Sequence, residues 1–73
     1  MKYIILIRLK DTVSDPVGNA VGTALKNLGH TVKDVRVGRL VQLESDGSRN
    51  DVEKMCQTIL VNPIIEDYEI VEK

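Results

Sequence analysis

The sequence predicts a small α+β domain in which helices pack on one side of a mixed or antiparallel sheet. Two patterns with helical periodicity alternate with strand-like segments, in the order strand, helix, long or split strand, helix, strand. This order is related to the ferredoxin-like plan. The 73 residues are enough for one domain, residues 1–73, and show no repeat or linker. We therefore expect a two-layer sandwich.

The first predicted strand covers residues 3–9 and is rich in β-branched and aromatic residues. Its odd-numbered positions, from Tyr3 to Leu9, share one face, whereas Ile4 and Leu6 lie on the other. Both faces are therefore apolar over at least the first half of the strand. We expect this strand to be buried on both sides.

The first predicted helix begins after Asp15 and ends at Gly29. Asp15 suits the N-cap, and Pro16 suits the first helical position, where a missing N–H costs nothing. An apolar stripe follows at helical spacing: Val17, Ala20, Val21, Ala24, Leu25 and Leu28. Gly18 and Gly22 are unfavourable inside a helix, so we expect another backbone to approach closely there.

Residues 32–44 form a strand-like segment with Gly38 near its middle. A continuous strand that bends or bulges at Gly38 keeps the apolar side chains on one face, namely Val35, Val37, Val41 and Leu43. A two-residue turn at Gly38 and Arg39 would mix apolar and charged side chains on each face. The bent strand is therefore favoured, and a three-residue turn stays open as the alternative.

The last part of the sequence predicts a turn, a second helix and a final strand. Residues 45–49 are typical of a turn, and Asn50 followed by Glu53 resembles a capping box. The second apolar stripe comprises Val52, Met55, Cys56, Ile59 and Leu60. Asn62 and Pro63 end this helix, and the final strand is expected at residues 64–71.

Composition excludes several classes of protein. A net charge of −1, two tyrosines, and no phenylalanine or tryptophan argue against nucleic-acid binding. The apolar run near the N-terminus is too short for a signal peptide or a membrane span, so we expect a cytoplasmic protein without membrane contact. Cys56 is the only cysteine, which excludes an internal disulfide and leaves too few ligands for structural zinc.

The sequence also predicts self-association. A domain of this size gains only about 3–5 kcal/mol from its own core, and natural chains of this length commonly add a partner. Residues 1–39 carry seven basic residues against three acids, whereas residues 40–73 carry eight acids against three basic residues. We expect these oppositely charged halves to face each other within or between protomers, in a homodimer or tetramer.

No catalytic set is evident in the sequence. Cys56 lies on an apolar helical stripe and His30 follows a helix end, so we interpret them as a core thiol and a solvated turn residue. Glu66 and Asp67 are strand neighbours that point to opposite faces and cannot share one metal ion. Arg36 and Arg39 could bind a phosphate, but contact with acids at a protein interface is favoured.

Four segments of the sequence resemble the PurS family, the small subunit of three-component phosphoribosylformylglycinamidine synthase. Residues 9–21 are similar to a lysine-containing strand end followed by a D-P-x-G-x-A-V helix start, and residues 24–29 to the exit of that helix. Residues 35–39 are similar to a V-R-x-G-K centre, with Arg39 in place of lysine. Residues 56–68 are similar to a C-x-x-L-L-x-N-P-x-I-E-D-Y ending, and the segment before the second helix is short for the family.

The resemblance implies a subunit without its own active site in the ATP- and glutamine-dependent ligase of purine biosynthesis. In that family a glutaminase subunit releases ammonia, and a large synthetase subunit uses ATP and Mg to form formylglycinamidine ribonucleotide. The small subunit forms dimers or tetramers and joins the two, so that ammonia passes between them. We expect this chain to bind no cofactor and to contact its partners through Arg36, Arg39, Asn62, Glu66, Asp67 and Tyr68.

Two other classes of function stay open at this stage. A regulatory module of similar fold could bind an amino acid or nucleotide at a dimer seam, and saturable binding by the isolated chain would favour it. A minimal enzyme that uses Cys56 or His30 is the third class, and turnover lost on changing either residue would support it.

Overall fold

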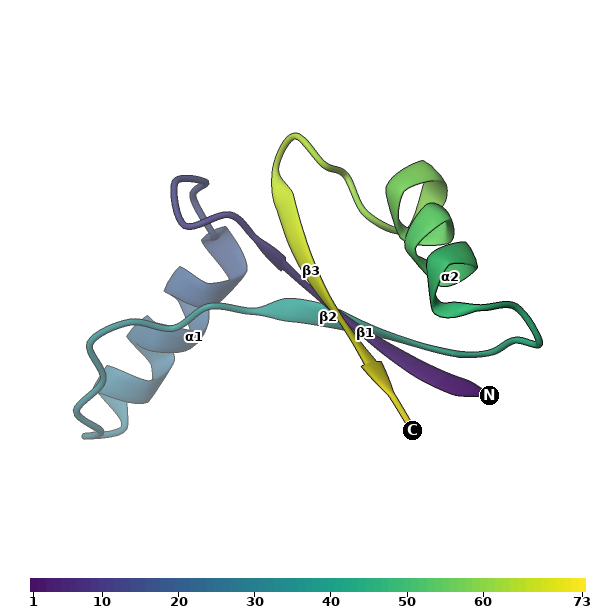
Figure 1. The fold of residues 1–73 in the computed structure, drawn as a ribbon. Helices are drawn as coiled ribbons and strands as arrows, with labels where there is room; N and C mark the ends of the chain where they lie inside the picture. Colours follow the sequence, from purple (N-terminus) through teal and green to yellow (C-terminus); the bar gives the residue numbers. More distant parts are fainter.

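The computed structural model describes residues 1–73 and contains three strands and two helices, the second of which continues into a π-helical turn (Figure 1). The elements are β1 (Lys2–Leu9), α1 (Pro16–Asn27), β2 (Gly38–Glu44), α2 (Arg49–Met55), η1 (Cys56–Leu60) and β3 (Glu66–Glu72). This order confirms the predicted α+β class. None of the helices has the length and apolar character needed to cross a bilayer.

The strands form one antiparallel sheet in the order β2-β1-β3. The central position falls to β1, the strand that is apolar on both faces and therefore gains most from a neighbour on each side. Ile5 lies opposite Val41 of β2 and Ile70 of β3. This register places the odd-numbered side chains of β1 on one face together with Val41 and Leu43 of β2 and Tyr68 and Ile70 of β3.

One face of the sheet carries the hydrophobic core. The buried residues of this core are Tyr3, Ile5, Ile7 and Ile70 from the sheet, with Val52, Cys56 and Val61 from α2, η1 and the segment that follows. The Tyr3 hydroxyl reaches the Gly47 carbonyl at 3.4 Å, so its polar end is satisfied at the edge of the core. The sheet and the α2–η1 segment make up the two predicted layers (Figure 1).

The other face of the sheet is open. Leu6 and Leu40, which are paired across β1 and β2, are 40% and 56% exposed. Ile4 is only half-buried, so the expectation that the first strand is buried on both sides is not met within the chain. The reason is that no helix of the same chain covers this face.

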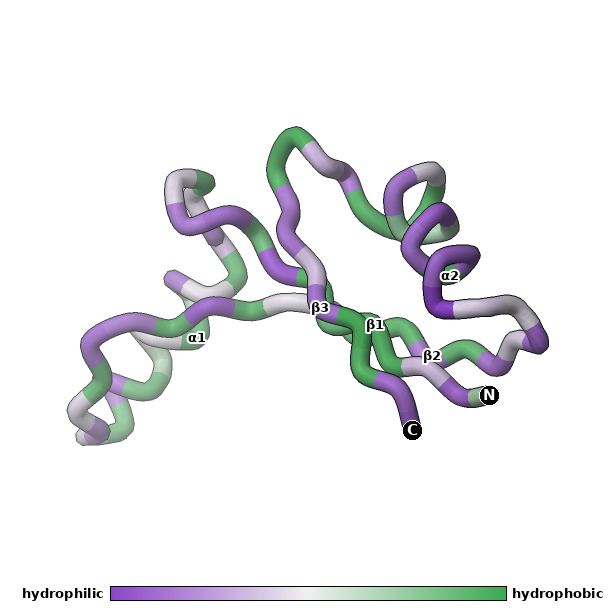
Figure 2. Tube along the Cα trace, in the orientation of Figure 1, coloured by the Kyte–Doolittle hydropathy of each residue, from purple (hydrophilic) through white to green (hydrophobic).

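α1 begins as predicted but does not join the core. Asp15 caps it by accepting a hydrogen bond from the Gly18 N–H at 2.8 Å. The helix lies beside the sheet rather than over it, and several of its turns are apolar in Figure 2. Val17 and Leu28, at the two ends of its apolar stripe, are 58% and 76% exposed. The stripe is therefore a second uncovered apolar surface.

The glycines of α1 face the segment that leads to β2. A Cβ on Gly18 would lie 2.3 Å from the Val35 carbonyl oxygen, and one on Gly22 would meet the Val35 side chain at 3.5 Å. The predicted close approach of another backbone is thus confirmed at Gly18. This contact is what binds α1 to residues 32–37.

Two local predictions are wrong. Residues 32–37 form no strand, and β2 begins only at Gly38, without a turn there. The reason is that β1 ends at Leu9, so this segment has no neighbouring strand to pair with. The N-cap of α2 is Ser48, which accepts from the Asp51 N–H, and Asn50 lies inside the helix.

The outline of the chain is elongated. Its radius of gyration is 15.1 Å and its extents are 46 × 25 × 14 Å. A compact domain of this length has a radius of gyration of about 11 Å. The difference arises because α1 projects to one side of the sheet while α2 lies toward the other (Figure 1).

Candidate functional site

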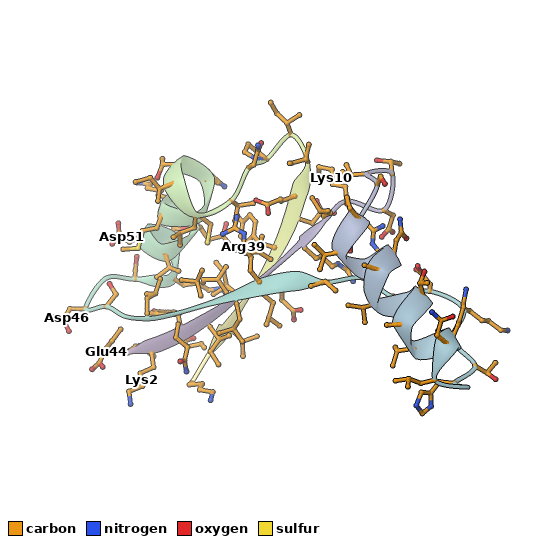
Figure 3. All side chains as sticks on the ribbon, turned by 180° about the vertical axis from the view of Figure 1, so that it is seen from behind. Lys2, Lys10, Arg39, Glu44, Asp46 and Asp51 are labelled. Carbon is orange, nitrogen blue, oxygen red and sulfur yellow. The ribbon has the colours of Figure 1, made fainter.

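The junction between η1 and β3 is held by one charged network. Arg39 of β2 contacts both carboxylate oxygens of Glu66, through Nη2 at 2.7 Å and Nε at 3.3 Å. The same Nη2 donates to the carbonyl oxygen of Leu60, the last residue of η1, at 2.9 Å. Figure 3 shows Arg39 on the side of the sheet that α2 occupies. A two-point arginine–carboxylate contact fixes orientation as well as distance, so β2, η1 and β3 are tied together.

The charge of Glu66 is stabilised by this network. The hydrogen bonds from the Arg39 side chain hold the pKa of Glu66 below its ordinary value, and the Asn62 backbone N–H, at 2.8 Å, adds to the effect. The side chain of Glu66 is 13% exposed, whereas that of Arg39 is 52% exposed. Glu66 is therefore an ionised and largely covered anchor, not a free surface carboxylate.

The loop between η1 and β3 is held in place by hydrogen bonds of its backbone N–H groups. Asn62 accepts from the Ile64 N–H through its side-chain oxygen at 3.1 Å, and its carbonyl oxygen accepts from the N–H groups of Ile65 and Glu66. The Lys10 N–H donates to the Ile65 carbonyl at 2.8 Å and joins the loop to the end of β1. The hydrogen bond from the Ile64 N–H to the Asn62 side-chain oxygen is typical of an Asx turn.

η1 and the loop that follows it display apolar side chains to solvent. Ile59 and Ile64 are 83% and 81% exposed, and Pro63 and Ile65 are exposed beside them. We call these four residues the junction tip. An apolar cluster on a fixed backbone loses little conformational entropy on binding, which is a property of protein-interface hot spots.

Asp67 and Tyr68 lie at the start of β3, next to the junction tip. Asp67 forms an ion pair with Lys10 on the exposed side of the strand, with 2.6 Å between Asp67 Oδ1 and Lys10 Nζ. Lys10 lies beside this strand in Figure 3. Tyr68 is half-buried and packs against the core. Glu66 and Asp67 point to opposite sides, as predicted for strand neighbours.

Arg36 is used within the chain. Its Nη2 atom donates to the carbonyl oxygens of Lys10 at 2.9 Å and Val13 at 3.0 Å, with the Leu9 carbonyl at 3.4 Å. The two short bonds use both hydrogens of that nitrogen. Arg36 therefore links the loop after β1 to the segment before β2.

Asp15 completes this second polar cluster and is 3% exposed. Its two carboxylate oxygens accept from the backbone N–H groups of Gly18 and Val37, both at 2.8 Å, and Arg36 Nε lies 4.0 Å away. The two backbone hydrogen bonds, followed by the Arg36 charge, hold the pKa of Asp15 below its ordinary value. The sequence identified Asp15 as a helix cap, but no local pattern revealed its contact with Val37.

The structure brings four of the six predicted interface residues together in one hollow, whereas Glu66 lines a second hollow and Asn62 lines neither. A hollow of about 540 Å³ is lined by Arg36, Arg39, Asp67 and Tyr68, among others. Glu66, Asp67 and Tyr68 also line a second hollow of about 560 Å³ beside Pro63. Sequence reasoning missed Lys10 and the junction tip.

The structure keeps Cys56 and His30 apart. Cys56 is fully buried in the core, and this burial, with a smaller contribution from Glu53, raises the pKa of its thiol. His30 is exposed just beyond the end of α1. They form no nucleophile–base pair, in agreement with the predicted roles of core thiol and turn residue. No group of three or more His, Cys, Asp or Glu side chains is placed to hold a metal ion.

The chain resembles known proteins in both sequence and structure. The family model of PurS, described as phosphoribosylformylglycinamidine (FGAM) synthase, matches residues 2–73. The chain is 38% identical to the PurS subunit of Methanocaldococcus jannaschii, over 99% of this chain and 95% of that protein. It is 39% identical to the PurS subunit of Bacillus subtilis, over 92% of this chain and 86% of that protein.

Solved structures show the same arrangement of elements. The crystal structure of M. jannaschii PurS matches 99% of this chain and 95% of its own length, with a TM-score of 0.85 and 36% identity. A chain in the PurLQS structure from Thermotoga maritima matches 99% of this chain and 95% of its own length, with a TM-score of 0.86 and 32% identity. Because these matches span nearly the whole chain, the position of α1 beside the sheet is part of the shared fold. The chain belongs to the PurS family, the small subunits of phosphoribosylformylglycinamidine synthase.

Proposed function

We propose that this chain joins the glutaminase and synthetase subunits of phosphoribosylformylglycinamidine synthase and takes no part in bond making. The observation that carries the proposal is the junction between η1 and β3. There a loop whose backbone N–H groups are hydrogen-bonded displays the junction tip beside a polar strand start, while the one thiol of the chain is buried in the core. Such a surface suits the binding of a protein better than the turnover of a substrate.

The six interface residues have two roles in this proposal. Arg39, Glu66 and Asn62 hold the backbone of the junction in place through the network described above, and Arg36 supports the loop behind it. Asp67 and Tyr68 line the surface that a larger subunit contacts, together with the junction tip. Loss of a supporting residue should therefore weaken partner binding by changing the shape of the surface.

The chain is proposed to act as a homodimer or tetramer. The isolated chain leaves two apolar surfaces uncovered, the open face of the sheet around Leu6 and Leu40 and the stripe of α1. Surfaces of this kind are expected to be buried in an assembly.

In the cytoplasm, where this biosynthetic step is proposed to occur, the assembled small subunit would hold the two larger subunits together. Ammonia released by the glutaminase subunit would then reach the synthetase subunit without loss to solvent. ATP and Mg would act at the synthetase subunit. The chain needs no catalytic group for this coupling role, because its contribution is to hold two active sites in a fixed relation.

Binding of the two larger subunits to immobilised variants tests this assignment. Ile64→Asp places a charge on the junction tip. It should weaken capture by about tenfold or more, since an apolar hot spot contributes about 2 kcal/mol to binding. Glu66→Ala, Arg39→Ala and Arg36→Ala should also reduce capture. Asp46→Ala, an exposed residue of the turn between β2 and α2, is the matched control and should bind normally. Normal capture by all four test variants would reject the assignment.

A further inference from the structure

The helix that begins at Arg49 changes its form before it ends. Its first part, α2, is an α-helix, and the five residues that follow form the π-helical turn η1. The Val61 N–H donates to the Cys56 carbonyl at 3.0 Å, five residues back along the chain, whereas an α-helix bonds four residues back. Such turns are rare and are frequent at functional sites. η1 directly precedes the loop of the junction tip, so its form decides which side chains reach that surface.

The form of η1 exposes Ile59. In an α-helix, Ile59 would lie seven residues after Val52 and three after Cys56, on the face that these two buried side chains share. The sequence predicted Ile59 to lie there. Instead Ile59 is 83% exposed, and Leu60 packs against the core. A turn that takes more residues rotates each of them less about the helix axis, so Leu60 occupies the place at the core that Ile59 would otherwise fill.

Two side chains hold η1 in this form. The Thr58 hydroxyl donates to the carbonyl of Lys54 at 2.8 Å, and the carbonyl of Met55 lies 3.4 Å from it. A threonine that bonds to the carbonyl four residues back slightly destabilises an α-helix and often bends it. At the other end of η1, Arg39 donates to the Leu60 carbonyl at 2.9 Å. Both contacts act on the helix backbone and therefore on the direction of the side chains that it carries.

The surroundings of η1 indicate the kind of partner that Ile59 suits. The charged groups of the junction are used within the chain, since Arg39 pairs with Glu66 at 2.7 Å and Lys10 with Asp67 at 2.6 Å. η1 follows α2 on the core side of the sheet (Figure 1). The surfaces proposed for self-association are the other face of the sheet and the stripe of α1. Ile59 is therefore free to contact a different protein, through an apolar pocket.

We propose that Thr58 is a positioning residue for assembly of the complex: it holds η1 in the π-helical form and so directs Ile59 outward into an apolar pocket of a larger subunit. The inference rests on the role of the junction tip given under the proposed function and adds the residue that sets its shape. A side chain already held in its bound direction loses little conformational entropy on binding. In an α-helical form, Ile59 would turn toward the core and could not reach the partner.

Variants of the full-length chain separate the hydroxyl of Thr58 from its shape. Thr58→Val keeps the branched shape and removes the hydroxyl, whereas Thr58→Ser keeps the hydroxyl. Ile59→Ala removes the side chain that enters the pocket. Thr23→Val is the matched control, because Thr23 is an exposed threonine of α1, outside η1. Thr58 and Ile59 are both exposed, so these changes leave the core intact, and circular dichroism checks that each variant is folded.

Two measurements are made on each variant. Hydrogen exchange of the Val61 amide in the free chain reports the form of η1. It should be roughly two- to tenfold faster in Thr58→Val than in wild type, the effect of losing one hydrogen bond, and close to wild type in Thr58→Ser. Capture of the two larger subunits by the immobilised chain reports the contact of Ile59.

Capture should follow the hydroxyl of Thr58. It should weaken roughly two- to tenfold in Thr58→Val, and by about tenfold or more in Ile59→Ala, as for the loss of an apolar hot spot. Thr58→Ser and Thr23→Val should bind as wild type. Normal capture by Thr58→Val, with weak capture by Ile64→Asp, would overturn the inference and leave the proposed function standing.

The double variant Thr58→Val, Ile59→Ala shows whether Thr58 acts through Ile59. If it does, removal of the hydroxyl adds nothing to the loss caused by Ile59→Ala, because no side chain is left to direct. An equal further loss in the double variant would mean that Thr58 acts independently of Ile59, which would overturn the inference.

The remaining results separate the inference from the proposed function. A smaller assembly in Ile59→Ala, with unchanged capture of the larger subunits, would place a second copy at Ile59 and overturn the choice of partner. Unchanged exchange of the Val61 amide in Thr58→Val would overturn the role of Thr58 in η1. Normal capture by the four test variants given under the proposed function would overturn that function and the inference together.

Discussion

Arg36 and Arg39 are three residues apart and hold different parts of the molecule. Arg36 binds backbone carbonyls of the loop after β1 and joins that loop to the segment before β2, whereas Arg39 binds Glu66 and the end of η1. Both use the several N–H groups of a guanidinium, which lysine cannot replace one for one. The carboxylates that face these arginines, Asp15 and Glu66, are the two whose pKa is lowered.

These two carboxylates predict how stability depends on pH. The ordinary pKa values are about 3.9 for aspartate and 4.3 for glutamate, and both are lowered in the folded chain. The stabilisation is therefore complete above about pH 5 and is lost as the pH falls through the lowered values. The double variant Asp15→Asn, Glu66→Gln should be less stable than wild type at neutral pH and should lose less stability on acidification.

Urea unfolding between about pH 6 and pH 3, at constant protein concentration, measures this dependence. The double variant Glu44→Gln, Asp46→Asn controls for the change in net charge, because it also removes one Glu and one Asp charge and both residues are exposed near the turn before α2. An identical acid dependence in the double variant and in wild type would show that neither carboxylate stabilises the fold.

At the scale of elements, the contact between α1 and residues 32–37 depends on Gly18 more than on Gly22. A Cβ at Gly18 would lie 2.3 Å from a backbone carbonyl oxygen and 2.7 Å from Asp15 Oδ2, which is held by its hydrogen bond from the Val37 N–H. A Cβ at Gly22 would meet Val35 at an ordinary 3.5 Å. The two glycines are four residues apart in one helix, so they form a matched pair.

Gly18→Ala should destabilise the fold by about 1–3 kcal/mol, the usual cost of overpacking. Gly22→Ala should be neutral or should stabilise it by up to about 1 kcal/mol, because alanine has the higher helix propensity. Thermal unfolding of both variants at one protein concentration gives the comparison. Equal effects of the two substitutions would show that α1 does not pack on Val35 as described.

The sequence predicted those features that depend on local interactions. Asp15 followed by Pro16 indicated the start of α1, because a cap bonds to the next turn of the same helix. The sequence also indicated that Glu66 and Asp67 diverge. It did not show that Asp15 reaches Val37 or that Arg39 reaches Leu60, since these contacts depend on the position of β1 at the centre of the sheet.

Other elements differ from the prediction for two reasons. α1 and residues 32–37 lack a surface or strand of the same chain to pack against, and at the start of α2 two residues compete for the N-cap position. The apolar stripe of α1 suggested burial, but no surface of the same chain covers it. Residues 32–37 have strand-like composition but no neighbouring strand. At the start of α2, Ser48 and Asn50 are both suitable caps, and Ser48 is the one that the Asp51 N–H reaches.

At the scale of the whole molecule, the elongated shape and the two uncovered apolar surfaces predict a stable assembly at micromolar concentration. Val21→Glu places a charge on the exposed stripe of α1 and should shift the sedimentation coefficient toward the monomer. Thr23→Glu, on the polar side of the same helix, is the control and should sediment as wild type. A folded monomer of the wild-type chain at this concentration would contradict the prediction.

The central claim is that this chain couples two active sites and has none of its own. The most direct measurement is the rate of formylglycinamidine ribonucleotide synthesis by the two larger subunits, with and without this chain, using either glutamine or ammonium at high concentration as the nitrogen source. The chain alone should show no activity. The account predicts that synthesis from glutamine requires the chain, whereas synthesis from ammonium proceeds in part without it, because the synthetase site is intact. Equal glutamine-dependent rates with and without the chain would contradict the account.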